Sequence, residues 1–299
     1  MRALMLNDSK VIFNMEAGMP KLTNLYNVLV KVHYAGICRT DIGIATGVIS
    51  AKEGIVLGHE FCGEIVGFLN GKEKMDDWSM GQAVSVNPMT FGSGEDMMCG
   101  KDCDGAFAEY IAVPSNALVG LSSHLLTPLG AFLEPVAAAL APLKHIHGRC
   151  CIFGGTRVAE LTHQVARVMG HKDTELITRT DDLQKNSFDC IIETEPHLID
   201  TYINALKPGG VLVMKSRSYA PNTITTNNIA MKEIRIQGAR YGDFHVASHI
   251  LTATSCHLAN TLDTSKLFGK VYELSEYERA FAEAGQTGSK KTFFRICAE

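Results

Sequence analysis

The stretch that decides the fold is CCIFGGTRVAELTHQVARV, residues 150–168. Its first four residues are apolar and end at the glycine pair Gly154-Gly155. Beyond the glycines, apolar residues recur at the spacing of one helix face: Val158, Leu161, Val165 and Val168. A short buried strand, a glycine turn and an amphipathic helix are therefore predicted in this order.

The same alternation continues toward the C-terminus. Further apolar runs predict strands, at ELIT (175–178), FDCIIE (188–193), KPGGVLVM (207–214) and IRIQGAR (234–240). YINAL, residues 202–206, predicts a helix between two of them. Strands that alternate with helices are typical of βαβ units, which form a parallel sheet with helices on both faces. We therefore predict a doubly wound α/β domain.

The residues before about Pro114 have a different pattern. Short β-branched and apolar runs lie between Gly, Asn and Pro residues, at 28–38, 61–69, 82–88 and 105–114. This spacing predicts a compact β-rich domain. The tail, 271–296, predicts strand, helix, glycine turn and strand. We assign 1–120 and 266–299 to the first domain and 121–265 to the second.

Composition excludes several classes of protein. The 299 residues carry a net charge of −4 and no long run of Lys or Arg, which argues against nucleic acid or an anionic membrane as partner. No segment approaches the roughly 18 apolar residues of a membrane span, and the N-terminus lacks a signal peptide. Nine scattered cysteines are typical of reduced thiols in a cytoplasm rather than of a disulfide framework.

Four pieces of the sequence carry candidate chemistry. They are Cys38 in GICRTD, His59-Glu60 in LGHEF, Glu134 in FLEPVA, and the glycine pair. Thiolate, imidazole and carboxylate are ligands that zinc accepts, and a catalytic zinc keeps about three protein ligands and one open position. Because Cys38 and His59 follow different strands, only the fold could bring them together.

The sequence resembles the zinc-dependent medium-chain dehydrogenase/reductase family. The resemblance is carried by three motifs in this order, GICRTD, GHE and LEPVA, the last just before the strand–glycine–helix unit. The polyol, glucose and threonine dehydrogenase branches are nearest, and the resemblance extends through NNIAMKEIRIQGAR (227–240) to the tail. It implies a β-rich GroES-like catalytic domain and a Rossmann-like cofactor domain. It also implies hydride transfer between NAD(P) and an alcohol, polyol or sugar-like substrate, or the corresponding carbonyl.

The resemblance implies one catalytic zinc, held by Cys38 and His59. Glu60 or Glu134 would supply the third ligand or alternate with bound water. Thr40 falls at the position of a hydroxyl proton relay, and Asp41 at that of a carboxylate that orients a ligand.

Two basic residues fall where the family binds the cofactor's pyrophosphate, Arg39 beside the ligand cysteine and Lys291 in SKKTFF. The glycine turn departs from the pattern G-x-G-x-x-G. It keeps Gly154, followed by Gly155, but places Thr156 at the middle glycine and Ala159 at the last. Thr156 would crowd the phosphates or donate a hydrogen bond to them.

The cofactor domain departs from the pattern further along. Arg179, near the end of the second strand, favours NADP, whereas Asp181 and Asp182 just beyond leave NAD open. Only LQKNS (183–187) stands where relatives have a helix and often a strand.

The lobe that holds a second, structural zinc in relatives also departs from the pattern. It keeps only Cys99 and Cys103, too few thiolates to close such a site, so we expect no second zinc.

Two alternative functions remain open. One is a zinc-free NADPH-dependent quinone or enoyl reductase of the same superfamily, which the cysteine and GHE ligands disfavour. The other is a degenerate, non-catalytic homologue, which the altered glycine turn favours. Loops around Ile42–Ile49 and Pro88–Gly94 are expected to line the substrate pocket, but they do not identify the substrate. By analogy, a homodimer or homotetramer is expected.

Overall fold

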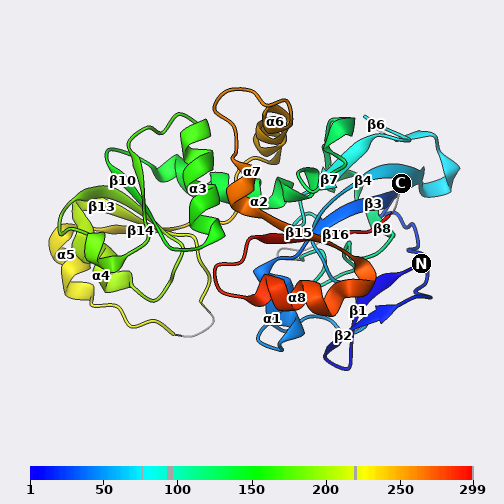
Figure 1. The fold of residues 1–299 in the computed structure, drawn as a ribbon, viewed down its shortest axis with the longest axis horizontal. Coiled ribbons are helices and arrows are strands. Elements are labelled where there is room, and N and C mark those ends of the chain that lie inside the picture. Colours follow the sequence, from blue (N-terminus) through cyan, green and yellow to red (C-terminus); the bar gives the residue numbers. More distant parts are fainter. Residues whose placement is uncertain (76, 93–96, 219–220, 298–299) are drawn as a thin grey trace. The chain divides into compact units, whose positions relative to one another are not determined.

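The computed structural model describes residues 1–75, 77–92, 97–218 and 221–297. It divides into two compact units (Figure 1). The first comprises Met1–Pro135, Phe244–Leu258 and Phe268–Glu299, and the second comprises Val136–Asp243 and Ala259–Leu267. The first unit therefore includes residues 121–135 and 244–258, which the sequence analysis assigned to the second domain. None of the described helices is both long enough and apolar enough to span a bilayer.

The first unit is built around a seven-stranded sheet of order β15-β16-β3-β4-β7-β9, with β8 also paired to β3 (Figure 1). The hairpin β1–β2 and the short pair β5–β6 stand apart from it. The strands are β1 (Ala3–Asn7), β2 (Lys10–Asn14), β3 (Val28–Gly36), β4 (Glu60–Phe68), β5 (Lys74–Met75), β6 (Trp78–Ser79), β7 (Ala83–Val86), β8 (Tyr110–Val113), β9 (Leu118–Gly120), β15 (Phe268–Glu273) and β16 (Lys291–Arg295). Its helices are α1 (Arg39–Ala45), α6 (Phe244–Ser255) and α8 (Tyr277–Gly285).

Strand register explains how distant segments of the first unit meet. In the antiparallel pair β3–β4, Gly36 lies opposite Glu60, so the end of one strand is beside the start of the other. Strand β16 pairs with the same end of β3, where Phe293 lies opposite Gly36. Three strand ends therefore meet at one place.

The second unit contains a five-stranded parallel sheet of order β11-β10-β12-β13-β14 (Figure 1). From the interior strand β10 the chain passes to β11 on one side and then to β12 on the other, so it winds in both directions. Right-handed crossovers then place the connecting helices on opposite faces. The elements are β10 (Cys150–Phe153), α3 (Arg157–Val168), β11 (Thr174–Ile177), β12 (Phe188–Glu193), α4 (Ile199–Ala205), β13 (Leu206–Met214), α5 (Thr226–Lys232), β14 (Arg235–Gly238) and α7 (Thr264–Leu267).

The predicted α/β class and parallel sheet are confirmed. All four residues of β10 are buried, as expected for a central parallel strand covered on both faces. The buried face of α3 differs at two of the predicted positions, because Val158 is 39% exposed and Val168 is only half-buried. Ala159 and Thr162 are buried instead, beside Leu161 and Val165. The predicted shortening is also found, because residues 178–187, all described, contain only the 3-10 turn Thr180–Asp182.

Some segments differ from expectation or were not predicted. The hairpin β1–β2 and helix α6 were not identified. Helix α1 begins one residue after Cys38 and covers part of the segment Ile42–Ile49, which was expected to be a pocket loop, and Ile44 packs into the core. Residues 93–94 of the second expected loop lie outside the described residues. Helix α2 (Leu133–Leu140) begins at the LEP motif and spans the boundary between the units.

Candidate metal centre

Cys38 is held at the start of α1, two residues after β3 ends. Its backbone N–H donates a 2.8 Å hydrogen bond to the Asp41 carboxylate, which caps the first turn of the helix. The Asp41 side chain is completely buried. The Cys38 thiol lies 3.8 Å from the Thr40 hydroxyl oxygen. The motif GICRTD is therefore a strand end and a helix start that fix a thiol beside a hydroxyl.

His59 and Glu60 lie where β4 begins. Gly58, just before them, has φ +92°, a conformation that glycine adopts without strain. Both side chains are buried, at 1% and 2% exposure. The Nδ1 atom of His59 faces Asp41, 3.7 Å from Oδ1. The same carboxyl group thus links the segment that carries Cys38 to the imidazole.

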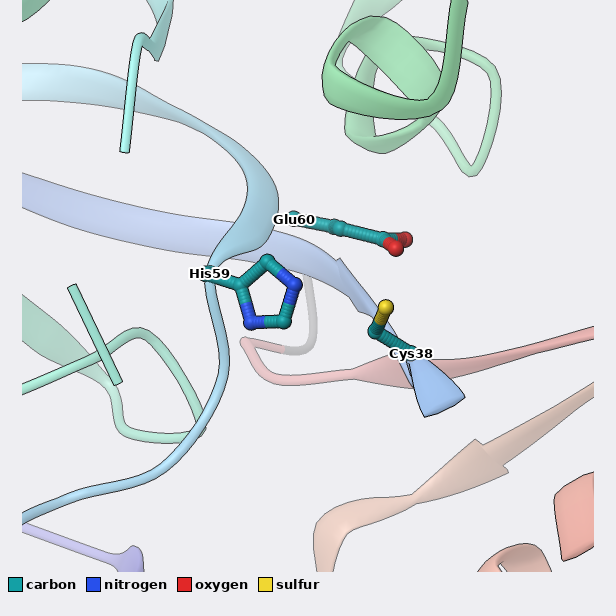
Figure 2. A group of neighbouring side chains, drawn as sticks. All are labelled: Cys38, His59 and Glu60. Carbon is teal, nitrogen blue, oxygen red and sulfur yellow. The ribbon is translucent and has the colours of Figure 1, made fainter. Parts of the chain in front are cut away.

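The ligand atoms of Cys38, His59 and Glu60 all lie within 4.8 Å of one another. Figure 2 shows the Cys38 side chain approaching those of His59 and Glu60, which are neighbours at the start of β4. Nε2 of His59 is buried and has no hydrogen-bond partner among the described residues. A buried imidazole nitrogen without a partner is costly unless it binds a ligand. One thiol, one imidazole and one carboxylate within this distance fit a zinc ion.

The electrostatics of the site also fit a cation. Burial raises the pKa of Asp41, although His59 opposes the effect. Burial also raises the pKa of Glu60, and the nearby Glu134 raises it further, while Lys291 opposes both. Burial lowers the pKa of His59, but Asp41 and Cys38 outweigh it and raise the value to about 10. Carboxyl groups and a thiol thus outnumber the positive charges, and a bound cation would relieve this imbalance.

Glu134 lies in the first turn of α2 and is 7% exposed. It is close enough for its charge to raise the pKa of both Glu60 and His59. Among the described residues, however, the group within 4.8 Å contains Glu60 and not Glu134. Of the two candidates for the third ligand, Glu60 is the one that lies beside the thiol and the imidazole.

Lys291 makes a contact that the sequence did not predict. Its ammonium pairs with the Glu60 carboxylate and donates a 2.8 Å hydrogen bond to the carbonyl oxygen of Ile37, and its side chain is 2% exposed. Gly36 makes room for the pair, because a Cβ there would lie 2.7 Å from both Glu60 Oε2 and Lys291 Cε. The predicted role of Lys291 at the pyrophosphate remains a prediction.

Arg39, the other predicted pyrophosphate ligand, is exposed at the start of α1. Its guanidinium donates hydrogen bonds of 3.4 and 3.3 Å to the carbonyl oxygens of Gly285 and Gln286. These carbonyls end α8, where a cation is favoured by the helix dipole.

The other predicted cofactor residues lie in the second unit. Gly154 and Gly155 follow β10, and Thr156 is the N-cap residue of α3. Arg179 follows β11, is 74% exposed, and lies 3.7 Å from Asp181. Sequence reasoning missed Glu195, which lies two residues beyond β12 and accepts a 2.8 Å hydrogen bond from Gly155 N–H. Its position just after a predicted parallel strand was the available signal.

Comparison with known proteins agrees with this architecture. Residues 25–123 match the alcohol dehydrogenase GroES-like domain. The chain is 23% identical to D-xylulose reductase A of Aspergillus niger, over 89% of this chain and 88% of the relative.

Two solved structures from Escherichia coli share the fold. Galactitol-1-phosphate dehydrogenase matches with a TM-score of 0.83 and 20% identity, over 99% of this chain and all of the other. A short chain alcohol dehydrogenase from strain CFT073, complexed with NADH, matches with a TM-score of 0.83 and 19% identity, over 99% of both chains. These similarities support the medium-chain dehydrogenase/reductase family, so the resemblance stated from the motifs is confirmed.

Proposed function

We propose that this protein is a zinc-dependent, NAD(P)-linked dehydrogenase that interconverts an alcohol, polyol or sugar-like substrate and its carbonyl. The observation that carries the proposal is the convergence of Cys38, His59 and Glu60, with the unpartnered Nε2 of His59 among them. The relatives named above support the substrate class, since they include a D-xylulose reductase and a galactitol-1-phosphate dehydrogenase.

Cys38 and His59 would hold the zinc ion, with Glu60 as third ligand and Glu134 as the alternative that the sequence left open. A bound zinc would supply Lewis-acid chemistry at the substrate oxygen, and a bound nicotinamide would supply the hydride exchange with the adjacent carbon. Asp41 positions His59, because its buried carboxyl group faces Nδ1 and leaves Nε2 for the metal. The Thr40 hydroxyl, beside the ligand thiol, would relay the proton that the alcohol loses on oxidation, passing its own proton to the cofactor ribose and so to solvent.

The second unit would bind the cofactor through the turn Gly154-Gly155-Thr156 at the start of α3. Arg39 and Lys291 are proposed to approach the pyrophosphate, and Arg179 the additional phosphate of NADP. NADP is the proposed cofactor, with NAD as the alternative.

Assembly and cellular location are proposals as well. We propose a homodimer or homotetramer that pairs through β14, because this edge strand of the parallel sheet has four exposed residues. Nine free cysteines favour a cytoplasmic location. The zinc-free reductase is disfavoured by the ligand set. A non-catalytic homologue would retain the fold but show neither cofactor binding nor turnover.

One preparation tests the proposed function. Metal analysis should give close to one zinc per chain, NADH or NADPH should change fluorescence on binding, and a panel of alcohols and polyols should reveal a substrate. A protein that binds cofactor and reduces a quinone without zinc would support the alternative reductase. A protein that binds neither zinc nor cofactor would rule out the dehydrogenase.

Glu60→Gln is expected to weaken zinc binding by about a hundredfold or more, and Glu134→Gln by less, because Glu60 lies beside the other two ligands. The measurement is a competition titration with a chelator. Glu60→Gln also leaves Lys291 without its carboxylate, so the double variant Glu60→Gln/Lys291→Met separates loss of a ligand from an unpaired buried charge. A larger loss for Glu134→Gln would make Glu134 the third ligand.

Arg179→Ala is expected to reduce the preference for NADPH over NADH by about tenfold, the effect of one charge-assisted hydrogen bond to the additional phosphate. The ratio of the two dissociation constants, measured by fluorescence titration, checks it. Arg167→Ala is the matched control. It removes an exposed arginine from the last turn of α3, away from the glycine turn that precedes the helix. An unchanged ratio in Arg179→Ala would exclude Arg179 from cofactor selection.

A further inference from the structure

A side chain of the protein lies at the point where the strand order of the parallel sheet reverses, between β10 and β12. Because β11 and β12 flank β10 on opposite sides, the segments that follow β10 and β12 leave the sheet next to each other. In open α/β sheets a ligand binds at this place, outside the carboxyl ends of the strands. Here Gly154 and Gly155 follow one strand, and Thr194 and Glu195 follow the other.

Hydrogen bonds fix the two segments to each other. The backbone N–H and the hydroxyl group of Thr194 both donate to the carbonyl oxygen of Phe153, at 3.0 and 2.8 Å. Gly155 N–H donates to Oε1 of Glu195 at 2.8 Å. The Tyr202 hydroxyl donates to the carbonyl oxygen of Glu195, also at 2.8 Å, and holds its backbone. The Glu195 carboxylate is therefore held over the glycine turn.

The glycines conform to this arrangement. Gly154 has φ +142°, and a Cβ there would overlap the Thr194 hydroxyl and lie 3.3 Å from Glu195 Oε1. The turn leads directly into α3, a helix of 12 residues. Backbone N–H groups at such a turn and the positive end of the helix dipole favour an anion. In this chain the anion is a side chain of the protein itself.

We propose that Glu195 competes with the pyrophosphate of the dinucleotide for this turn and so lowers the affinity of the protein for its cofactor. The proposal rests on the proposed function, because it assumes that a dinucleotide binds here. A carboxylate and a pyrophosphate cannot both accept the Gly155 N–H, and their like charges repel each other at close range. Glu195 is thus an affinity-setting residue of the cofactor site.

The test is the affinity of the intact protein for NADH and NADPH, measured by fluorescence titration at low ionic strength. Glu195→Gln keeps a hydrogen-bond acceptor for Gly155 and removes the charge, so its dissociation constants should fall about tenfold. Glu195→Ala frees the N–H and should bind at least as tightly as Glu195→Gln. Adenosine, which has no phosphate, should bind to all variants equally, whereas ADP should follow the dinucleotides.

Glu175→Gln is the matched control, because it removes one negative charge from the same unit. Glu175 lies near the amino-terminal ends of the parallel strands, opposite the glycine turn, and pairs with Arg149. The affinity of this variant for NADH should equal that of the wild type. Thermal unfolding of each variant shows whether the fold is kept.

The outcomes separate this inference from the proposed function. Tighter binding of NADH by both Glu195 variants, but not by Glu175→Gln, supports the proposal. Equal or weaker binding by the Glu195 variants overturns the proposal and leaves the dehydrogenase function standing. If neither the wild type nor the variants bind a dinucleotide, both ideas fail. An equal gain in adenosine binding would also overturn the proposal, because the effect would then not depend on phosphate.

Discussion

Cys38→Ala and His59→Ala should each lose the bound zinc, from close to one ion per chain to nearly none, and activity should fall with it. Each change removes one of the three ligand atoms that lie within 4.8 Å, and two protein ligands do not hold a catalytic zinc firmly. Because the metal is the proposed Lewis acid, we expect kcat/KM to fall by on the order of a thousandfold or more. Metal analysis of dialysed protein and steady-state kinetics provide the two measurements.

Matched variants distinguish loss of a ligand from loss of a residue type. Cys297→Ala removes a half-buried thiol, and His124→Ala removes an exposed imidazole, both in the same compact unit. Both should keep zinc and activity. If Cys38→Ala and His59→Ala retained the wild-type zinc content, the metal would have to be held elsewhere and the proposed site would be wrong.

The sequence predicted the second unit well because its signals are local. Residues 150–168 contain a fully apolar run, a glycine pair and a helical repeat. These patterns predict a buried strand, a turn and an amphipathic helix without reference to the rest of the chain. The exceptions are Val158, which is exposed, and Val168, which is only half-buried, although both fit the helical spacing. Since α3 packs on a sheet, its buried face is set by the strands beneath it, and Ala159 and Thr162 fit there better.

The metal centre was predicted from a resemblance because spacing alone could not show that its residues meet. Cys38 and His59 are brought together by the β3–β4 register, in which Gly36 lies opposite Glu60. Such a pairing depends on the whole sheet. The Lys291–Glu60 contact also depends on β16 joining β3, so a residue near the C-terminus reaches the site without any local signal.

The segment before His59 is hydrogen-bonded to residues 105–107, a contact that the sequence did not predict. Gly105, Ala106 and Phe107 donate backbone hydrogen bonds of 2.8, 2.9 and 2.8 Å to the carbonyl oxygens of Val56, Gly58 and Leu57. The Cys99 thiol lies 3.7 Å from the carbonyl oxygen of Gly58. The described part of the shortened cysteine loop thus contacts the backbone that leads into His59.

Gly105→Ala is therefore expected to destabilise the protein by on the order of 3 kcal/mol, through overpacking against backbone that cannot rotate away. The backbone of Gly105 is not in the left-handed region, so the cost is one of space. A Cβ there would lie 2.5 Å from the carbonyl oxygen of Leu57 and would overlap that of Gly58. Because Gly58 precedes His59, any relief by backbone movement shifts the imidazole, and zinc affinity should fall together with stability.

Gly18→Ala provides the control, since Gly18 is exposed, lies in the same unit, and has no atom within 4 Å of the position that a Cβ would take. It should change the free energy of unfolding by no more than about 0.5 kcal/mol. Denaturant unfolding and a chelator competition measure stability and zinc affinity on the same samples. Wild-type stability in Gly105→Ala would show that the loop can move away from Leu57 and Gly58. The loop around Gly105 would then not be what holds His59 toward Cys38 and Glu60.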